Sequence, residues 1–251
     1  MFDTHCHLNF EAFKDTYPDV IKSAKEAGVN YMLVPGTDLE TSKKAGEIAD
    51  FYEGIFAAVG IHPTKDLEAL DLGSTLFRLK EMLREDKVVA VGEVGLDYYR
   101  YKSGPRLQKE FFESQIQLAL KNGKSLIIHN RHAGEDILKT VTKNWNRSFE
   151  KRSVFHCCEA DFEILSFAEK HGVYIGVDGD VTYDKEKQEF VKKIPLELLV
   201  VETDSPYIIP EPLRSQKIFL SEPGGSSPNL EVLRTGGQSR RPNEPKNVKI
   251  I

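Results

Sequence analysis

The chain has 251 residues, 40% of them hydrophobic and 29% charged, and this length commonly forms one α/β-barrel domain. A net charge of −5 argues against a broad basic surface for nucleic acid, so a phosphate-bearing substrate must be held locally, by metal ions and a few cations. No apolar run approaches the roughly 20 residues of a membrane span, and no signal peptide is evident. The three cysteines, two of them adjacent, fit no disulfide framework. We therefore expect a cytoplasmic protein with no membrane association and no obligate protein partner.

Short apolar runs alternate with longer amphipathic ones along the chain. Strands separated by helices indicate βαβ units and a parallel sheet, and eight such strands predict a (β/α)₈ TIM barrel of the α/β class. The alternative, a doubly wound open sheet, usually has fewer strands, and no GxGxxG motif follows a strand. The predicted strands lie near residues 1–5, 29–34, 55–59, 88–92, 125–129, 153–156, 173–177 and 198–203. The predicted helices cover residues 17–27, 39–52, 74–85, 106–122, 134–145, 160–171 and 185–193.

The C-terminal part of the chain departs from this alternation. Residues 1–214 are expected to form the barrel, whereas residues 215–251 are rich in Pro, Gly and Ser and show little helical period. We therefore predict an irregular tail with an inserted loop at 215–240, and the absence of the helix that should close the barrel.

Polar residues that can bind metal follow most of the predicted strands. His5 and His7 end the first strand, and alternation of side chains along an extended strand puts both on one face. In a barrel, active sites form where the C-terminal ends of strands meet the following loops, so these residues should converge on one rim. The others on the same rim are His62, Glu93, His129, His156 and Asp204.

Each of these residues alone has an ordinary structural interpretation, such as a hydrogen-bonded core histidine or a turn-forming aspartate. The coincidence of four histidines and two carboxylates at strand ends favours a metal site. Mixed nitrogen and oxygen donors suit Zn²⁺, Mn²⁺ or Mg²⁺. Six ligands exceed what one open catalytic ion needs, so two divalent ions bridged by a carboxylate are expected.

Several motifs together resemble the TatD family of metal-dependent deoxyribonucleases, which belongs to the amidohydrolase-like barrels. The resemblance runs from residue 1 to about residue 214 and resumes at residues 241–245. The motifs are Asp3-Thr4-His5-Cys6-His7-Leu8, Gly60-Ile61-His62-Pro63, Gly92-Glu93-Val94-Gly95-Leu96-Asp97-Tyr98-Tyr99, His129 after a strand, Phe155-His156, Glu202-Thr203-Asp204-Ser205-Pro206-Tyr207 and Arg241-Pro242-Asn243-Glu244-Pro245.

The resemblance implies a nuclease that acts on DNA from an end, with RNA left open. It implies one ion held by His5, His7, Glu93 and Asp204, and a second held by Glu93, His129 and His156. It also implies that His62 and Arg131 contact substrate phosphate and that Asp204 orients or deprotonates the attacking water.

The chain departs from the family pattern after His156, where Cys157 and Cys158 stand in place of an aromatic and small residues. Two other functions stay open. One is amide, lactone or phosphotriester hydrolysis by a related barrel, in which a carboxylated lysine on strand 4 commonly bridges the ions. Here Glu93 occupies that position, and the nearest lysine is Lys87 before the strand. The other is a truncated, non-catalytic relative. Tyr98 and Tyr99 are candidates to stack a base.

Overall fold

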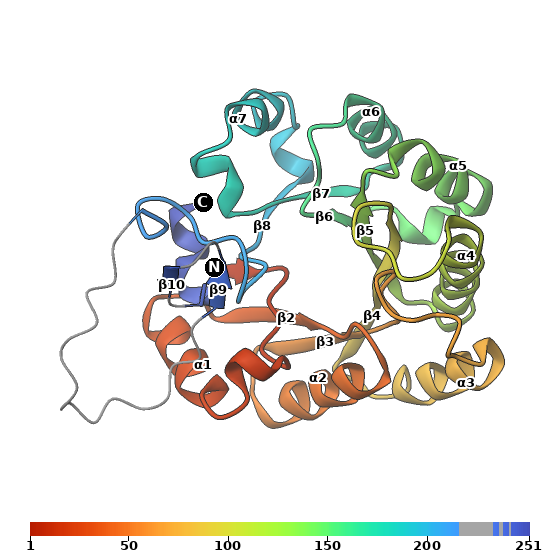
Figure 1. Cartoon of the computed structure of the whole chain (residues 1–251), viewed down its shortest axis with the longest axis horizontal. Coiled ribbons are helices and arrows are strands. Elements are labelled where there is room, and N and C mark those ends of the chain that lie inside the picture. The colour runs from red at the N-terminus through yellow and green to blue at the C-terminus, as the bar shows by residue number, and fades with distance from the viewer. Residues whose placement is uncertain (216–232, 236–237, 241) are drawn as a thin grey trace.

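The computed structural model describes residues 1–215, 233–235, 238–240 and 242–251. Eight parallel strands lie side by side in chain order, which confirms the predicted (β/α)₈ barrel (Figure 1). The strands are β1 (Phe2–Asp3), β2 (Tyr31–Pro35), β3 (Ile55–Val59), β4 (Val88–Asp97), β5 (Ser125–Arg131), β6 (Val154–His156), β7 (Tyr174–Val177) and β8 (Leu199–Val201).

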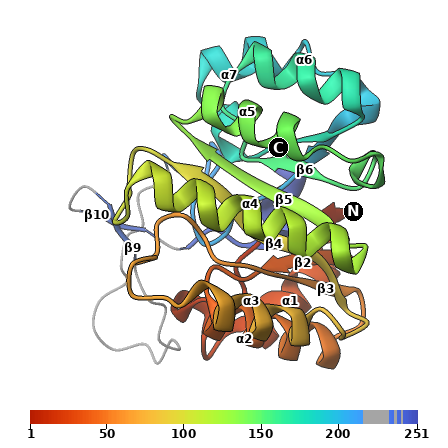
Figure 2. The same cartoon turned by 90° about the vertical axis from the view of Figure 1, so that its right-hand side faces the viewer.

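Helices cover the outside of the strands, as the two perpendicular views show (Figure 2). Each α-helix begins and ends within three residues of its predicted bounds. Aspartates explain several of these starts, because Asp38, Asp71, Asp161 and Asp184 accept hydrogen bonds from first-turn N–H groups. The helices are α1 (Tyr17–Glu26), α2 (Leu39–Phe51), α3 (Leu72–Met82), α4 (Pro105–Asn122), α5 (Gly134–Asn144), α6 (Phe162–His171) and α7 (Lys185–Val191), with 3-10 helices η1 (Glu11–Phe13), η2 (Arg147–Phe149), η3 (Gly179–Thr182), η4 (Leu196–Leu198) and η5 (Pro245–Ile250).

The ring closes between the first and last strands. Cys6 and Ser205 form a parallel bridge, and the His7 N–H donates to the Ser205 carbonyl at 2.7 Å. The Asp204 N–H in turn donates to the His5 carbonyl at 2.9 Å. The closure therefore uses the backbone of the HxH motif itself, and it sets Asp204 beside the two histidines.

The inside of the barrel is filled by a small apolar cluster of Ala58, Ala90, Ile127 and Val154, all nearly inaccessible to solvent. Ile127 and Val154 precede two of the candidate ligands by two residues, so each shares a strand face with its histidine. The polar residues thus lie on a packed apolar floor.

Strand β4 is longer than predicted. It continues to Asp97, so Glu93 lies inside the strand rather than at its end, and the register with β5 shifts between Val91 and Val94. The residues after Glu93 are all buried, which removes the polar alternation that would have identified them as strand. The irregular register turns the strand where the glutamate faces the site.

The tail also differs in part from the expectation. Strands β9 (Leu233–Thr235) and β10 (Gln238–Arg240) form a short antiparallel pair within the segment predicted to be irregular. The Gly-Gly dipeptide between them in the sequence is a hairpin signal as well as a breaker. The predicted loop over residues 216–232 lies outside the described residues. Helix η5 contacts α1 and buries Val248. None of the helices in the described ranges could cross a membrane.

Candidate metal centre

Four candidate ligand atoms lie close together, on the segment after β1, on β4 and on the loop after β8. The His5 and His7 Nε2 atoms are 3.2 Å apart, and they lie 3.5 and 3.6 Å from Glu93 Oε2. Asp204 Oδ1 lies 3.7 Å from His5 Nε2 and 3.3 Å from His7 Nε2. Four atoms held about 2.1 Å from a common ion in tetrahedral geometry would lie roughly 3.4 Å apart. The spacing of the His5, His7 and Asp204 atoms therefore fits a divalent cation, and Glu93 Oε2 lies next to the two histidines.

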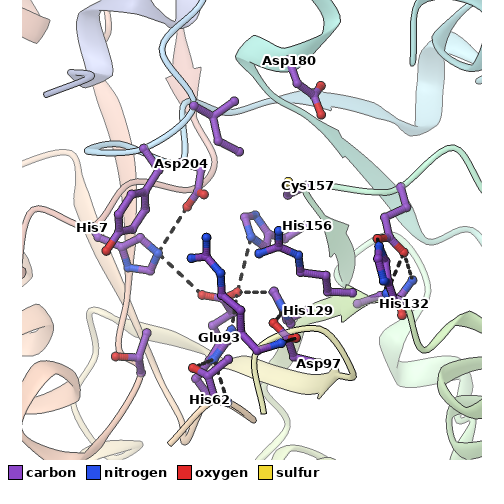
Figure 3. Close-up of a pocket in the computed structure, with 18 of the residues that line it drawn as sticks. His7, His62, Glu93, Asp97, His129, His132, His156, Cys157, Asp180 and Asp204 are labelled. Atoms are coloured by element: carbon purple, nitrogen blue, oxygen red, sulfur yellow. Dashed lines mark hydrogen bonds and ion pairs between the residues drawn. The ribbon is translucent and has the colours of Figure 1, made fainter. Parts of the chain in front are cut away.

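The other oxygen of Glu93 faces a second set of nitrogens (Figure 3). Glu93 Oε1 lies 2.9 Å from His129 Nδ1, 3.4 Å from His156 Nε2 and 3.2 Å from His62 Nε2. Glu93 is 3% exposed, and its two oxygens thus face two groups of histidines. His62 approaches Glu93 as closely as the other histidines do, so its position alone does not separate a ligand from a phosphate contact.

Three sets of side chains bring their ligand atoms within 4.8 Å of one another. They are His5–Glu93–His156, His5–His7–Asp204 and His62–Glu93–His129. The imidazole rings of His5 and His156 are also stacked, with their centroids 3.5 Å apart. All six candidate ligands predicted from the sequence, and His62, are therefore brought together.

Two buried carboxylates orient the histidines from behind. Glu202 Oε1 lies 3.0 Å from His156 Nδ1, and Asp97 Oδ2 lies 3.1 Å from His129 Nε2. A carboxylate on the second ring nitrogen fixes the tautomer and raises the basicity of a metal-binding histidine. Both residues lie within the sequence motifs, but the motifs predicted no role for them. Their position in the sequence could have indicated this role, because Asp97 follows the candidate ligand Glu93 by four residues and Glu202 precedes Asp204 by two.

Glu202 has room in this position because β7 carries a glycine opposite it. A Cβ on Gly176 would lie 2.5 Å from Glu202 Oε1. The same oxygen also accepts a hydrogen bond from the Cys157 N–H at 2.5 Å. Cys157 lines the pocket, whereas Cys158 is buried in the core, as expected for adjacent residues of a strand end.

Asn243, from the Asn-Glu-Pro motif, supports the loop after β8. It is 1% exposed, and its side-chain amide donates to the carbonyls of Thr203 at 2.9 Å and Ile208 at 3.1 Å. Asp204 between them has a φ of +46°, a left-handed backbone that costs free energy and must be held by its surroundings. Asn243 is a further residue of the site whose role the sequence analysis missed.

The charges of the cluster are strongly coupled. Burial by itself raises the pKa of Glu93, but His62, His156 and a hydrogen bond from His129 hold it well below its usual range. Burial lowers the pKa of His156, but Glu202 and Glu93 overcome this and raise it well above its usual value. Asp204 keeps a lowered pKa despite its burial, because His7 bonds to it and His156 is near. The carboxylates are therefore anionic at neutral pH, as metal ligands must be.

The site opens into a pocket of about 1290 Å³. Arg131, predicted to contact phosphate, lines this pocket, and its guanidinium lies 4.1 Å from the centre of the exposed Tyr99 ring. Tyr98 instead packs against the core and donates its hydroxyl to Asp136 at 2.7 Å. Only Tyr99 of the two tyrosines thus stays a candidate for base stacking.

Comparison with known proteins identifies the family. The family model described as "TatD related DNase" matches residues 2–250. The chain belongs to this family. It is a metal-dependent hydrolase that acts on ester bonds, as the resemblance in the sequence implied.

Among relatives, the chain is 37% identical over 220 residues to the uncharacterized metal-dependent hydrolase YabD of Bacillus subtilis, covering 86% of this chain and 84% of that protein. It is 32% identical over 216 residues to the 3'-5' ssDNA/RNA exonuclease TatD of Escherichia coli, covering 85% and 82%. The crystal structure of YJJV, a TatD homologue from Escherichia coli, superposes with a TM-score of 0.78 at 26% identity, covering 99% of this chain and 86% of the other.

Proposed function

We propose that this TatD-family member removes nucleotides from an end of single-stranded or frayed DNA, using two divalent ions. The observation that carries the proposal is the position of Glu93, whose Oε2 faces His5 and His7 while its Oε1 faces His129 and His156. One ion would be held by His5, His7, Glu93 and Asp204, and the other by Glu93, His129 and His156. The donor set suits Mg²⁺, Mn²⁺ or Zn²⁺.

Two ions about 3.5–4 Å apart would stabilise the attacking and leaving oxygens of an in-line displacement at phosphorus. Asp204, with its lowered pKa and its place at the pocket, orients the attacking water and accepts its proton. His62 and Arg131 line the same pocket and contact the substrate phosphate. Glu202 and Asp97 keep the imidazoles in the orientation that binds metal.

A strand end is the favoured substrate because the donors are buried at the base of a pocket rather than spread over a surface. The side chains of His5 and Glu93 are only 0% and 4% exposed. The middle of a duplex would not reach side chains buried this deeply. The name of the Escherichia coli relative includes RNA, so RNA is the second substrate to test. A cytoplasmic setting is part of the proposal, and all three cysteines are free thiols.

Amide, lactone or phosphotriester hydrolysis is disfavoured, because β4 contains no lysine that could bridge two ions. Lys87 precedes β4, and its ammonium lies over the Phe56 ring at 5.3 Å. It is at the opposite end of the strand from the cluster and cannot bridge two ions there. The complete donor set likewise disfavours a non-catalytic relative.

The test is metal analysis of the purified protein, followed by hydrolysis of an end-labelled single strand with Mg²⁺, Mn²⁺ or Zn²⁺. We expect two ions per chain and products shortened from one end, and we expect Glu93→Ala to lose both metal and activity. Full metal content in Glu93→Ala, or faster cutting of closed circular duplex than of linear single strands, would refute the proposal. His62→Ala should keep its metal and bind substrate more weakly, and loss of metal would make His62 a ligand instead.

A further inference from the structure

A second arginine–tyrosine pair lines the pocket, on the side of β7 and β8. The Arg214 guanidinium carbon lies 3.8 Å from the centre of the Tyr183 ring. Both residues line the pocket that holds Glu93 and Asp204. A guanidinium at this distance makes a cation–π contact with the ring, and its five N–H donors can still bind a phosphate. Neither residue is a candidate metal ligand.

The backbone that carries the pair is tightly fixed. Tyr183 directly follows η3, and Arg214 lies in the loop after β8. The two segments touch at Gly179, where an added Cβ would lie 2.4 Å from the Ile208 carbonyl oxygen. The Glu211 N–H also donates to Thr182 Oγ1 at 2.8 Å. Because these contacts fix both segments, the stack is held in place before any ligand binds.

The charge of Arg214 is not neutralised within the described part of the chain, where no carboxylate lies within 4.0 Å of its guanidinium. Two acidic residues on the same wall have other partners. Asp180 pairs with the Lys187 ammonium at 3.3 Å, and Asp184 accepts the first N–H groups of α7. With respect to the described residues, Arg214 therefore offers an unpaired cation to the pocket in a protein whose net charge is −5.

The pair matches Arg131 and Tyr99, which stack at 4.1 Å on the side of β4 and β5. In the ring of eight strands, β8 is three strands from β5, so the two stacks occupy different sides of the pocket. The candidate ligand atoms, which follow β1 or belong to β4, β5 and β6, lie at the base of the pocket that both stacks line. A single-stranded nucleic acid whose scissile phosphate sits at this base would extend past one arginine–tyrosine stack or the other.

We propose that Arg214 and Tyr183 form a nucleotide-binding subsite beside the metal centre. The Arg214 edge binds a non-scissile phosphate, and the exposed part of the Tyr183 ring contacts the neighbouring base, as aromatic residues do in proteins that bind single strands. This subsite rests on the proposed nuclease function. It predicts that substrates of several nucleotides gain from contacts that a minimal phosphodiester cannot make.

The test compares two substrates with Mn²⁺-loaded enzyme: a thymidine pentanucleotide, which spans the subsite, and bis(p-nitrophenyl) phosphate, which does not. The measured quantity is the ratio of kcat/KM for the pentanucleotide to kcat/KM for the small diester. Loss of one base–aromatic contact corresponds to a decrease of about 5- to 150-fold. Arg214→Gln and Tyr183→Leu should each lower the ratio within this range, mainly through KM, and Tyr183→Phe should retain it.

Arg78→Gln on α3 and Tyr31→Leu on β2 are matched controls, because both side chains are exposed and neither lines the pocket. They should leave the ratio unchanged. If the wild-type protein hydrolyses both substrates and the ratio is the same in Arg214→Gln and Tyr183→Leu, the subsite is wrong and the proposed function stands. If the wild-type protein hydrolyses neither substrate, the proposed function is wrong and the subsite with it.

Discussion

Glu202 provides the most informative single change, because it touches no predicted ligand atom yet fixes one ligand ring. Its side chain is fully buried, and Oε1 lies 3.0 Å from His156 Nδ1. Glu202→Gln keeps the size of the side chain and an oxygen that can accept the same hydrogen bond, but it removes the charge. Loss of such an outer partner typically lowers metal affinity or activity 10- to 100-fold, or about 1.4 to 2.7 kcal/mol.

The charge also predicts a change in pH dependence with a definite sign. Glu202 is the main group that raises the pKa of His156 against the effect of burial. Glu202→Gln should therefore lower the pKa of this ring, so that fewer protons compete with the metal at acid pH. Metal affinity should fall at alkaline pH, and its decrease on acidification should be less steep than in the wild-type protein.

The assay is calorimetric titration of metal-free protein with Mn²⁺ or Zn²⁺ over a pH series, together with kcat/KM for a single-stranded substrate. Glu197→Gln is a suitable control, because this glutamate is exposed and precedes β8 at the far end of the strand. Unchanged metal affinity and an unchanged pH profile in Glu202→Gln would refute the assigned role. A lower melting temperature with both properties intact would mean that Glu202 only stabilises the fold.

Three other measurements test the site and its substrate. The pKa values of His129 and His156 are raised in the metal-free protein, although burial lowers both. Asp97 and Glu93 raise that of His129, and Glu202 and Glu93 raise that of His156. Protonated imidazole binds no metal, so metal affinity should rise as the pH increases through neutrality. Metal binding should release protons, which calorimetry detects as binding heats that depend on the buffer. Heats independent of the buffer would contradict this. Asn243→Ala removes the partner of the buried Thr203 carbonyl and of the partly buried Ile208 carbonyl. A buried unpaired carbonyl costs about 1–3 kcal/mol, so the melting temperature should fall by roughly 2–4 °C per kcal/mol. Activity should fall with it, and an unaltered melting curve would show that the loop is held by other contacts. Arg131 and Arg214 are the only arginine or lysine residues proposed to bind phosphate, so the slope of log K against log [salt] should be about −1 to −3. A slope near −8 would reveal an extended basic groove.

Local periodicity was sufficient to predict the barrel. The eight apolar runs and seven amphipathic runs each became the expected strand or helix. Strand alternation also placed His5 and His7 on one face, because that geometry depends only on neighbouring residues. The set of candidate ligands followed from the rule that barrel strands carry functional groups at their C-terminal ends.

The length of β4 could not be predicted from the same pattern. Its last residues are buried on both sides, so they lack alternation, and Glu93 looked like the end of the strand. The short β9–β10 pair was missed for a similar reason, because its glycines were interpreted only as breakers.

Tertiary structure alone decided which side chains meet. Glu202 lies 46 residues from His156, and Asn243 lies 40 residues from Thr203, so no local pattern could pair them. The two faces of Glu93, the supporting carboxylates and the stack of Arg214 on Tyr183 likewise depend on strands that are adjacent only once the barrel closes. The sequence thus predicted which residues are candidate metal ligands and that they share one rim. The closed ring determined which atom of each faces which partner, because that arrangement is set by contacts between distant segments.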